Sequence, residues 1–194
     1  MHMKRVIFFL VCIIGLMAIA NYQTMAGNKP PVKGDSLPPF ELVAPADPGI
    51  KSYLGVTGGK RFTIPQIKAQ VVLIWLFSRY WPICRKEAFR VNKLYAIIQK
   101  REDLRDKVKL IGIGLKNTPA DIEYFKKKYQ VPFSLFSDED GSVYNLMGKA
   151  KTPYFIGVKL HEGGNPEVFY GKVGVVSRKL NDFLERMLKL AGYE

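Results

Sequence analysis

The stretch from Val71 to Ile98 constrains the fold more than any other part of this 194-residue chain. It begins with an unbroken apolar run, Val71 to Phe77, which is typical of a strand buried on both faces of a sheet. Pro82 stands where a first helical position is expected, because its fixed φ suits that position and its missing N–H is not needed there. Apolar side chains then recur at helical spacing and indicate an amphipathic helix: Cys84, Ala88, Val91, Tyr95 and Ile98. A buried strand that leads into a helix N-terminus favours chemistry, since free N–H groups and the helix dipole attract an anion there.

Four segments, in order along the chain, resemble those of one protein family. Residues 81–87 (WPICRKE) resemble the W-C-P-P-C-R-x-E active-site turn of thioredoxin-fold, membrane-tethered thiol–disulfide oxidoreductases. These form the TlpA/ResA-like branch of the redoxins, within the AhpC/TSA superfamily. Residues 33–42, 61–67 and 151–156 are similar to that family's opening segment, to its hairpin and turn, and to its G-T-P-T-x-F-x-I segment. The resemblance implies an α/β, thioredoxin-like three-layer sandwich, in which helices flank a central mixed β-sheet after an N-terminal β-hairpin extension.

The rest of the pattern agrees with an α/β sandwich, because buried strands alternate with helices. Residues 108–115 read as a second buried strand, and Thr118 with Pro119 and Asp121 predicts a helix start. A terminal hairpin follows at residues 154–170. Ser177 is expected to cap the last helix. The Pro- and Gly-containing residues 44–60 indicate a long loop.

The first twenty residues predict an export signal. Two basic residues precede an uncharged apolar run at residues 6–20, which is about the length of a signal-peptide core and short for a spanning helix. An uncleaved anchor that associates with the inner membrane through residues 6–20 is the alternative. Residues 21–33 are polar and Pro-rich and are expected to be a linker, and residues 34–194 the thioredoxin-like domain. We therefore expect an exported protein of the periplasm or cell envelope.

Cys84 is the one cysteine expected in the exported domain, since Cys12 lies inside the apolar leader. A dithiol–disulfide cycle within one chain is therefore excluded. By the resemblance, Cys84 matches the second, resolving cysteine, and Trp81 occupies the place of the first, attacking one. The apolar stripe around Cys84 predicts partial burial, which raises a thiol pKa, whereas the first helical turn and Arg85 would stabilise a thiolate. A reactive thiol and a merely structural thiol are both compatible with this position.

Several neighbouring positions are candidates for the same site. By the resemblance, Glu87 would tune thiol acidity or relay protons; a solvated residue paired with a lysine is the alternative. An exposed Trp81 would suit contact with a peptide, or it could pack against residues 44–60. The resemblance also implies a cis peptide bond before Pro153, in a segment that offers backbone groups to an extended substrate. The expected substrate- or partner-binding residues are Tyr80, Trp81, Pro82, Thr152 and Pro153.

Other chemistries find little support. The peroxiredoxin pattern P-x-x-x-T/S-x-x-C would place a proline at Phe77 and a hydroxyl at Trp81, and neither matches. With His161 alone outside the leader, a His-based triad or a metal cluster is hard to build, and no nucleotide motif is present. The net charge of +13 comes from scattered basic residues, which favours a solvated surface near anionic lipid or an acidic partner rather than nucleic acid. We therefore expect no metal and no cofactor.

Two functions stay open. The first is a redoxin-type oxidoreductase or antioxidant protein that acts through Cys84 on a peroxide or on a protein or peptide thiol or disulfide. The second is a non-catalytic thioredoxin-fold module that binds a protein partner in the envelope. An exposed Cys84 with a low pKa would favour the first, and a buried, unreactive Cys84 the second.

Overall fold

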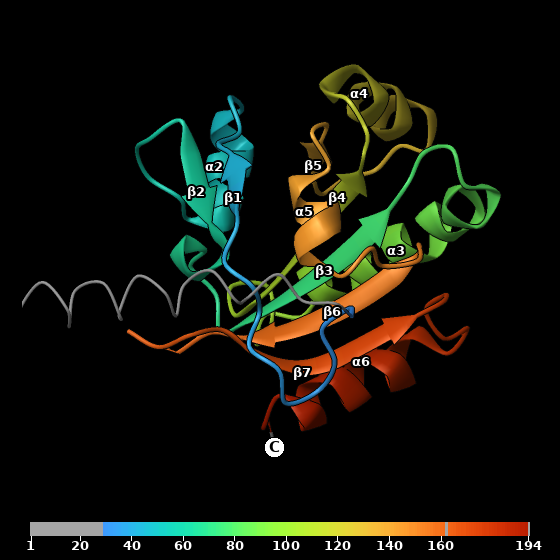
Figure 1. Ribbon diagram of the computed structural model, residues 1–194. Helices are drawn as coiled ribbons and strands as arrows, with labels where there is room; N and C mark the ends of the chain where they lie inside the picture. Colours follow the sequence, from blue (N-terminus) through green and yellow to red (C-terminus); the bar gives the residue numbers. More distant parts are fainter. Residues whose placement is uncertain (1–28, 162, 194) are drawn as a thin grey trace, which may run out of the picture.

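The computed structural model describes residues 29–161 and 163–193, which are arranged around a five-stranded sheet (Figure 1). The strand order is β5-β4-β3-β6-β7. β3 pairs in parallel with β4 and β4 with β5, whereas β6 is antiparallel to both β3 and β7. The sheet is therefore mixed, as predicted. Its strands are β3 (Val71–Phe77), β4 (Val108–Leu115), β5 (Ser134–Asp138), β6 (Tyr154–Lys159) and β7 (Glu167–Val173).

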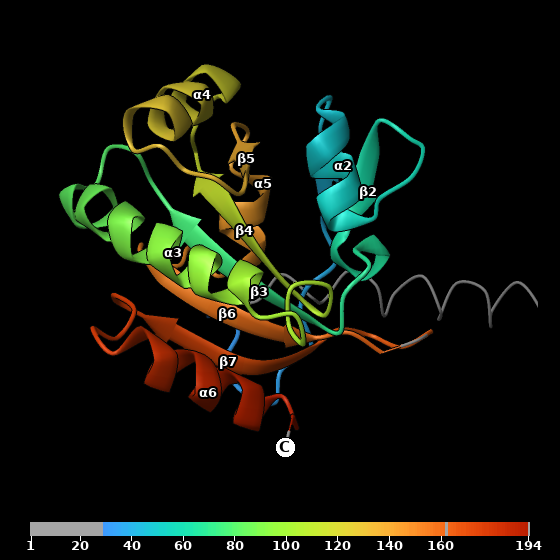
Figure 2. The same cartoon turned by 180° about the vertical axis from the view of Figure 1, so that it is seen from behind.

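The central strand β3 is buried along its whole length because both faces of the sheet are covered. Side chains alternate between the two faces. Those of Leu73 and Trp75 pack beneath α3 (Pro82–Lys100) and α6 (Leu180–Leu190), which Figure 2 shows covering one face. On the other face of the sheet, the side chains of Ile74 and its even-numbered neighbours pack toward α5 (Ser142–Leu146) and the N-terminal hairpin. Three layers result, as expected.

The predicted N-terminal hairpin is present as β1 (Glu41–Val43) and β2 (Arg61–Thr63), followed by the short helix η1 (Ile64–Gln66). The prediction of a loop at residues 44–60 is wrong, because this segment contains the helix α2 (Pro48–Leu54). Asp47 caps α2 by accepting a hydrogen bond from the Ile50 N–H at 3.0 Å. Leu54 is fully buried, so α2 belongs to the core of this face.

The two predicted helix starts differ in outcome. Thr118 caps α4 (Pro119–Lys128) in a reciprocal capping box with Asp121, as predicted. Ser177 does not cap α6, which begins after Lys179. The Ser177 hydroxyl, three residues before the helix begins, instead accepts a hydrogen bond from the Lys179 N–H at 3.2 Å.

The described part of the predicted linker lies against the domain. The Tyr154 hydroxyl donates a hydrogen bond to the Pro31 carbonyl at 3.0 Å, and the Gly34 N–H donates to the Val168 carbonyl at 2.8 Å. Residues 29–34 therefore follow β7 before the hairpin begins. The predicted signal or anchor at residues 1–20 and residues 21–28 of the linker lie outside the described residues. Within the described part, no helix is long and apolar enough to cross a membrane.

Candidate functional site

The turn between β3 and α3 lies at the carboxyl end of the central strand. Trp81 is the N-cap of α3, with extended backbone angles, and its N–H donates to the Ser78 carbonyl at 3.1 Å. Pro82 occupies the first turn of the helix, as predicted. Because β6 is antiparallel to β3, its first residue Tyr154 pairs with Leu76 near the end of β3. The Thr152–Pro153 segment, whose peptide bond is cis as expected, therefore reaches the same end of the sheet.

The Cys84 side chain lies in the core between the sheet and α3 and has no exposed surface. Burial raises the pKa of the Cys84 thiol above its ordinary value. Hydrogen bonds from the Ser78 backbone and the Thr152 side chain act in the opposite direction, and the nearby Glu87 carboxylate raises the pKa further. The sequence predicted partial burial of Cys84, whereas in the structure its burial is complete. This burial favours the neutral thiol over the thiolate.

Arg85 follows Cys84 in sequence but is exposed. Its positive charge contributes to lowering the pKa of Tyr124 on α4. Apart from burial, the pKa of the Cys84 thiol responds to the Ser78 backbone, the Thr152 side chain, Glu87 and the backbone of Cys84 itself. The structure therefore places Arg85 in a surface cluster with α4, away from the role of thiolate stabiliser expected for it.

Glu87 is completely buried, so the alternative of a solvated helix residue is wrong. One carboxylate oxygen accepts a hydrogen bond from the Val176 N–H at 2.6 Å. The other pairs with the Arg90 guanidinium at 2.5 Å. Burial raises the pKa of Glu87, and these two partners lower it in part. One oxygen thereby joins α3 to the loop before α6 and the other is held by a partner on α3 itself, which favours a positioning role.

The exposed part of the turn is aromatic. Trp81 is 53% exposed and Tyr80 is 59% exposed, so residues 44–60 do not cover Trp81. Pro82 is exposed as well, and Thr152 is half-buried. Pro153 is buried, so its ring is not available to a partner. Of the five expected binding residues, four lie on or near the surface of one turn.

Asp121 on α4 holds this turn in place, which the sequence did not predict. Its carboxylate pairs with the Arg79 Nε at 3.1 Å and accepts a hydrogen bond from the Tyr80 hydroxyl at 2.9 Å. The same carboxylate closes the capping box by accepting from the Thr118 N–H at 3.0 Å. Burial acts to raise the pKa of Asp121, but hydrogen bonds from Thr118 and Tyr80 and the Arg79 charge hold it below its usual range. The sequence predicted only the capping role.

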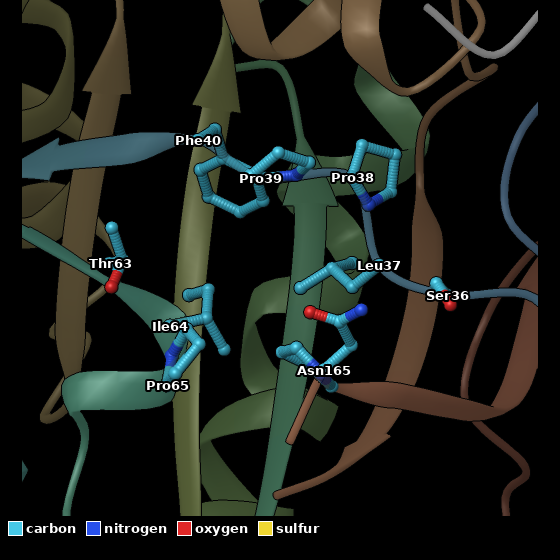
Figure 3. A pocket seen from close by; sticks show the side chains of 10 residues that line it. Ser36, Leu37, Pro38, Pro39, Phe40, Thr63, Ile64, Pro65 and Asn165 are labelled. Atoms are coloured by element: carbon cyan, nitrogen blue, oxygen red, sulfur yellow. The ribbon is translucent and has the colours of Figure 1, made fainter. Parts of the chain in front are cut away.

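An apolar cavity of about 420 Å³ lies elsewhere, near the amino end of β3. Figure 3 shows Leu37, Phe40 and Ile64 among the side chains around it. Asn165 borders it from the β6–β7 connection, which meets the beginning of β3, where Val71 pairs with Lys159. The cavity therefore lies at the opposite end of the central strand from Cys84, and no predicted site residue lines it.

A model described as the AhpC/TSA family matches residues 34–172, a span that includes the β3–α3 turn and Thr152–Pro153. A search of curated proteins finds no match.

Solved structures with a similar fold include the following three. The thioredoxin domain of a thiol-disulfide oxidoreductase from Bacteroides vulgatus is 14% identical, with a TM-score of 0.58 over 80% of this chain and 97% of that one. A secreted Mycobacterium tuberculosis disulfide oxidoreductase is 17% identical, with a TM-score of 0.52 over 77% and 95%. StoA from Bacillus subtilis is 20% identical, with a TM-score of 0.51 over 68% and 94%. At these identities the likeness concerns the fold alone, and it confirms the thioredoxin-like prediction.

Proposed function

The chain belongs to the AhpC/TSA family, and from this premise we propose that it binds a protein or peptide partner in the cell envelope without reacting with it. The observation that carries this proposal is the burial of the only sulfur at the turn. Cys84 has no exposed surface, whereas Trp81, at the place that the resemblance gives to an attacking cysteine, is 53% exposed.

Thiol–disulfide exchange requires a thiolate that can reach the sulfur of another disulfide. Cys84 meets neither condition, since its side chain is covered and its pKa is raised by burial. In a two-cysteine site a buried second thiol is useful, because it attacks a mixed disulfide already formed within the turn. Here Trp81 cannot form that intermediate, so the buried thiol has nothing to resolve.

The surface that a partner would meet is formed by the turn itself. Trp81 and Tyr80 offer large aromatic contact areas at little cost in side-chain entropy, which is why such residues are frequent binding anchors. Ile83 adds a third exposed apolar side chain. Thr152 lies at the same end of the sheet. Together these residues form what we call the aromatic turn surface: Tyr80, Trp81, Pro82, Ile83 and Thr152.

The location in the envelope rests on the leader. Basic residues before the apolar run at residues 6–20 are what an export signal or an inner-membrane anchor requires. Fusion of residues 1–28 to a reporter that is active only after export would test this part of the proposal.

The binding proposal is tested by the reactivity of Cys84. Purified residues 29–194 would be treated with a thiol reagent across a range of pH, with urea-denatured protein as the reference. We expect labelling of the native protein to be slower by about a hundredfold or more, with a midpoint above the ~8.5 of a free thiol. Native labelling as fast as that of the denatured chain, with a midpoint below that value, would overturn the proposal.

A second function, one-cysteine oxidoreductase chemistry, is favoured by one observation. The Ser78 backbone and the Thr152 side chain lie near the Cys84 thiol and act to lower its pKa, against the effect of burial. In this reaction the thiolate would attack a peroxide oxygen, giving a sulfenic acid and releasing the other oxygen as water or an alcohol. Intact mass after dilute peroxide decides between the functions: rapid gain of one oxygen on Cys84 in the native protein supports this one.

A further inference from the structure

A small pocket of about 160 Å³ lies beside the aromatic turn surface. It is formed where the β3–α3 turn and the first turn of α3 meet the second half of α4. Phe125 is buried in the core beneath it. Its other lining residues are three cations and three phenols: Arg79, Arg85 and Lys128, with Tyr80, Tyr124 and Tyr129.

The Arg79 guanidinium is held in a fixed position. It lies 4.7 Å from the centre of the Tyr80 ring and 4.8 Å from that of Tyr124, so two aromatic rings flank it. Its Nε pairs with Asp121 at 3.1 Å, and its backbone N–H donates to the Asn117 side chain at 2.9 Å. A cation that is already ordered loses little entropy when an anion binds.

The other two cations leave the pocket with an excess of positive charge. Lys128 donates a hydrogen bond to the Tyr124 hydroxyl at 3.0 Å. Among the residues that the structure describes, no carboxylate lies within ion-pair distance of Arg85 or Lys128. In the described part of the chain, Asp121 is therefore the one carboxylate that pairs with any of the three cations. Lys128, Arg79 and Arg85 all act to lower the pKa of Tyr124, as expected for a phenol in a positive field.

We propose that this pocket receives a carboxylate of an acidic segment in the partner that docks on the aromatic turn surface. The inference rests on the proposed binding function and specifies the partner's chemistry. The pocket has room for one such group, and arginine and lysine are its natural counter-charges. Exposed Trp81 and Ile83 next to it offer contacts to the neighbouring side chains of a peptide, which favours a protein segment over a free anion.

The test uses two fluorescein-labelled peptides that differ only in having Glu or Gln at alternate positions around a central Phe. Binding to residues 29–194 would be followed by fluorescence anisotropy. We expect the Glu peptide to bind more tightly and its affinity to fall as salt is raised. The double variant Arg85→Gln/Lys128→Gln should weaken binding by about tenfold or more. Lys127→Gln, on the same helix but outside the pocket, is the matched control and should change it less than twofold.

Three results would overturn the inference. The first is equal binding of the Glu and Gln peptides, and the second is an unchanged affinity in the double variant. The third is binding of inorganic phosphate at the pocket without binding of the Glu peptide, since this would indicate a free-anion site. If the Glu and Gln peptides bind equally but Trp81→Ala weakens both, the docking surface stands and only the pocket's role fails. Rapid labelling of native Cys84 would instead count against the proposed function.

Discussion

Glu87 brings a carboxylate into the core one helical turn after Cys84, and this has a consequence for stability. Because burial raises the pKa of Glu87, the folded state favours its protonated form more than the unfolded chain does. A group with a raised folded pKa stabilises the protein below its unfolded pKa, about 4.3 for Glu, and loses this contribution as pH rises through the folded pKa. The free energy of unfolding of the wild type should therefore contain a contribution that is lost as pH rises through this range. The Glu87→Gln variant should lack this pH-dependent loss.

The expected result is that Glu87→Gln gains stability relative to wild type as pH rises from about 4 to 7. Urea unfolding at several pH values measures the difference directly. Exposed Glu102 provides the control, because Glu102→Gln should show no such trend. If Glu87→Gln loses stability relative to wild type over the same interval, the ion pair with Arg90 outweighs burial and the direction of the pKa shift is wrong.

A second residue-scale prediction concerns Asp121, which supports both the α4 cap and the turn. Thr118→Ala removes the N-cap hydroxyl alone and should cost about 1 kcal/mol. Asp121→Ala also removes the partners of Arg79 and Tyr80, so its cost should exceed that of Thr118→Ala. Denaturant unfolding of both variants tests this order. Equal costs would mean that the contacts to the turn add nothing to stability.

At the scale of elements, the end of α2 depends on Gly55. Its φ of +66° is left-handed, and a Cβ there would lie 2.5 Å from the Lys68 Cβ. Gly55→Ala therefore combines backbone strain with a clash. Gly58 has a similar φ of +73° but open space around it, so Gly58→Ala isolates the strain at about 1 kcal/mol. We expect Gly55→Ala to destabilise clearly more in thermal or urea unfolding. Similar losses would show that Lys68 moves aside freely.

The elements that local patterns predicted are those with a strong apolar period and a clear cap. β3, α3 with Pro82 and α4 with Thr118 are confirmed. The helix α2 was missed because its Pro and Gly content reads as a loop, although Asp47 before Pro48 and the later Gly55 are signals for a short capped helix. Short helices are the hardest to predict, since few residues carry their period.

At the scale of the whole molecule, the parts of the site that the sequence could not predict depend on contacts between distant segments. The buried Glu87 carboxylate accepts a hydrogen bond from the Val176 N–H, 89 positions away. The pocket forms because Tyr80 meets Asp121 across 41 positions. No local pattern contains these separations. The resemblance implied that Thr152–Pro153 belongs to the same site as Cys84, and the antiparallel pairing of β6 with β3 brings this segment to the same end of the sheet.

If the whole scaffold still suits thiol chemistry, a single substitution should reveal it. Trp81→Cys places a thiol at an exposed helix N-cap, where the dipole lowers a thiol pKa. Residues three apart across a first helical turn have Cα atoms about 5.5 Å apart, within reach of a disulfide. The new thiolate could attack a substrate disulfide. Cys84 would then displace the substrate thiol, give up its proton and close an intramolecular disulfide, which an added dithiol such as dithiothreitol reduces again.

Insulin reduction in the presence of dithiothreitol measures this activity. Trp81→Cys should exceed wild type by about tenfold or more, whereas Trp81→Ser and the double variant Trp81→Cys/Cys84→Ala should not. Both controls keep the altered turn but lack one of the two thiols. A folded Trp81→Cys variant that forms no disulfide under oxidising conditions would mean that the Cys84 sulfur is inaccessible even to a thiol in the neighbouring turn. In that case burial alone would be enough to keep the Cys84 sulfur out of thiol–disulfide exchange.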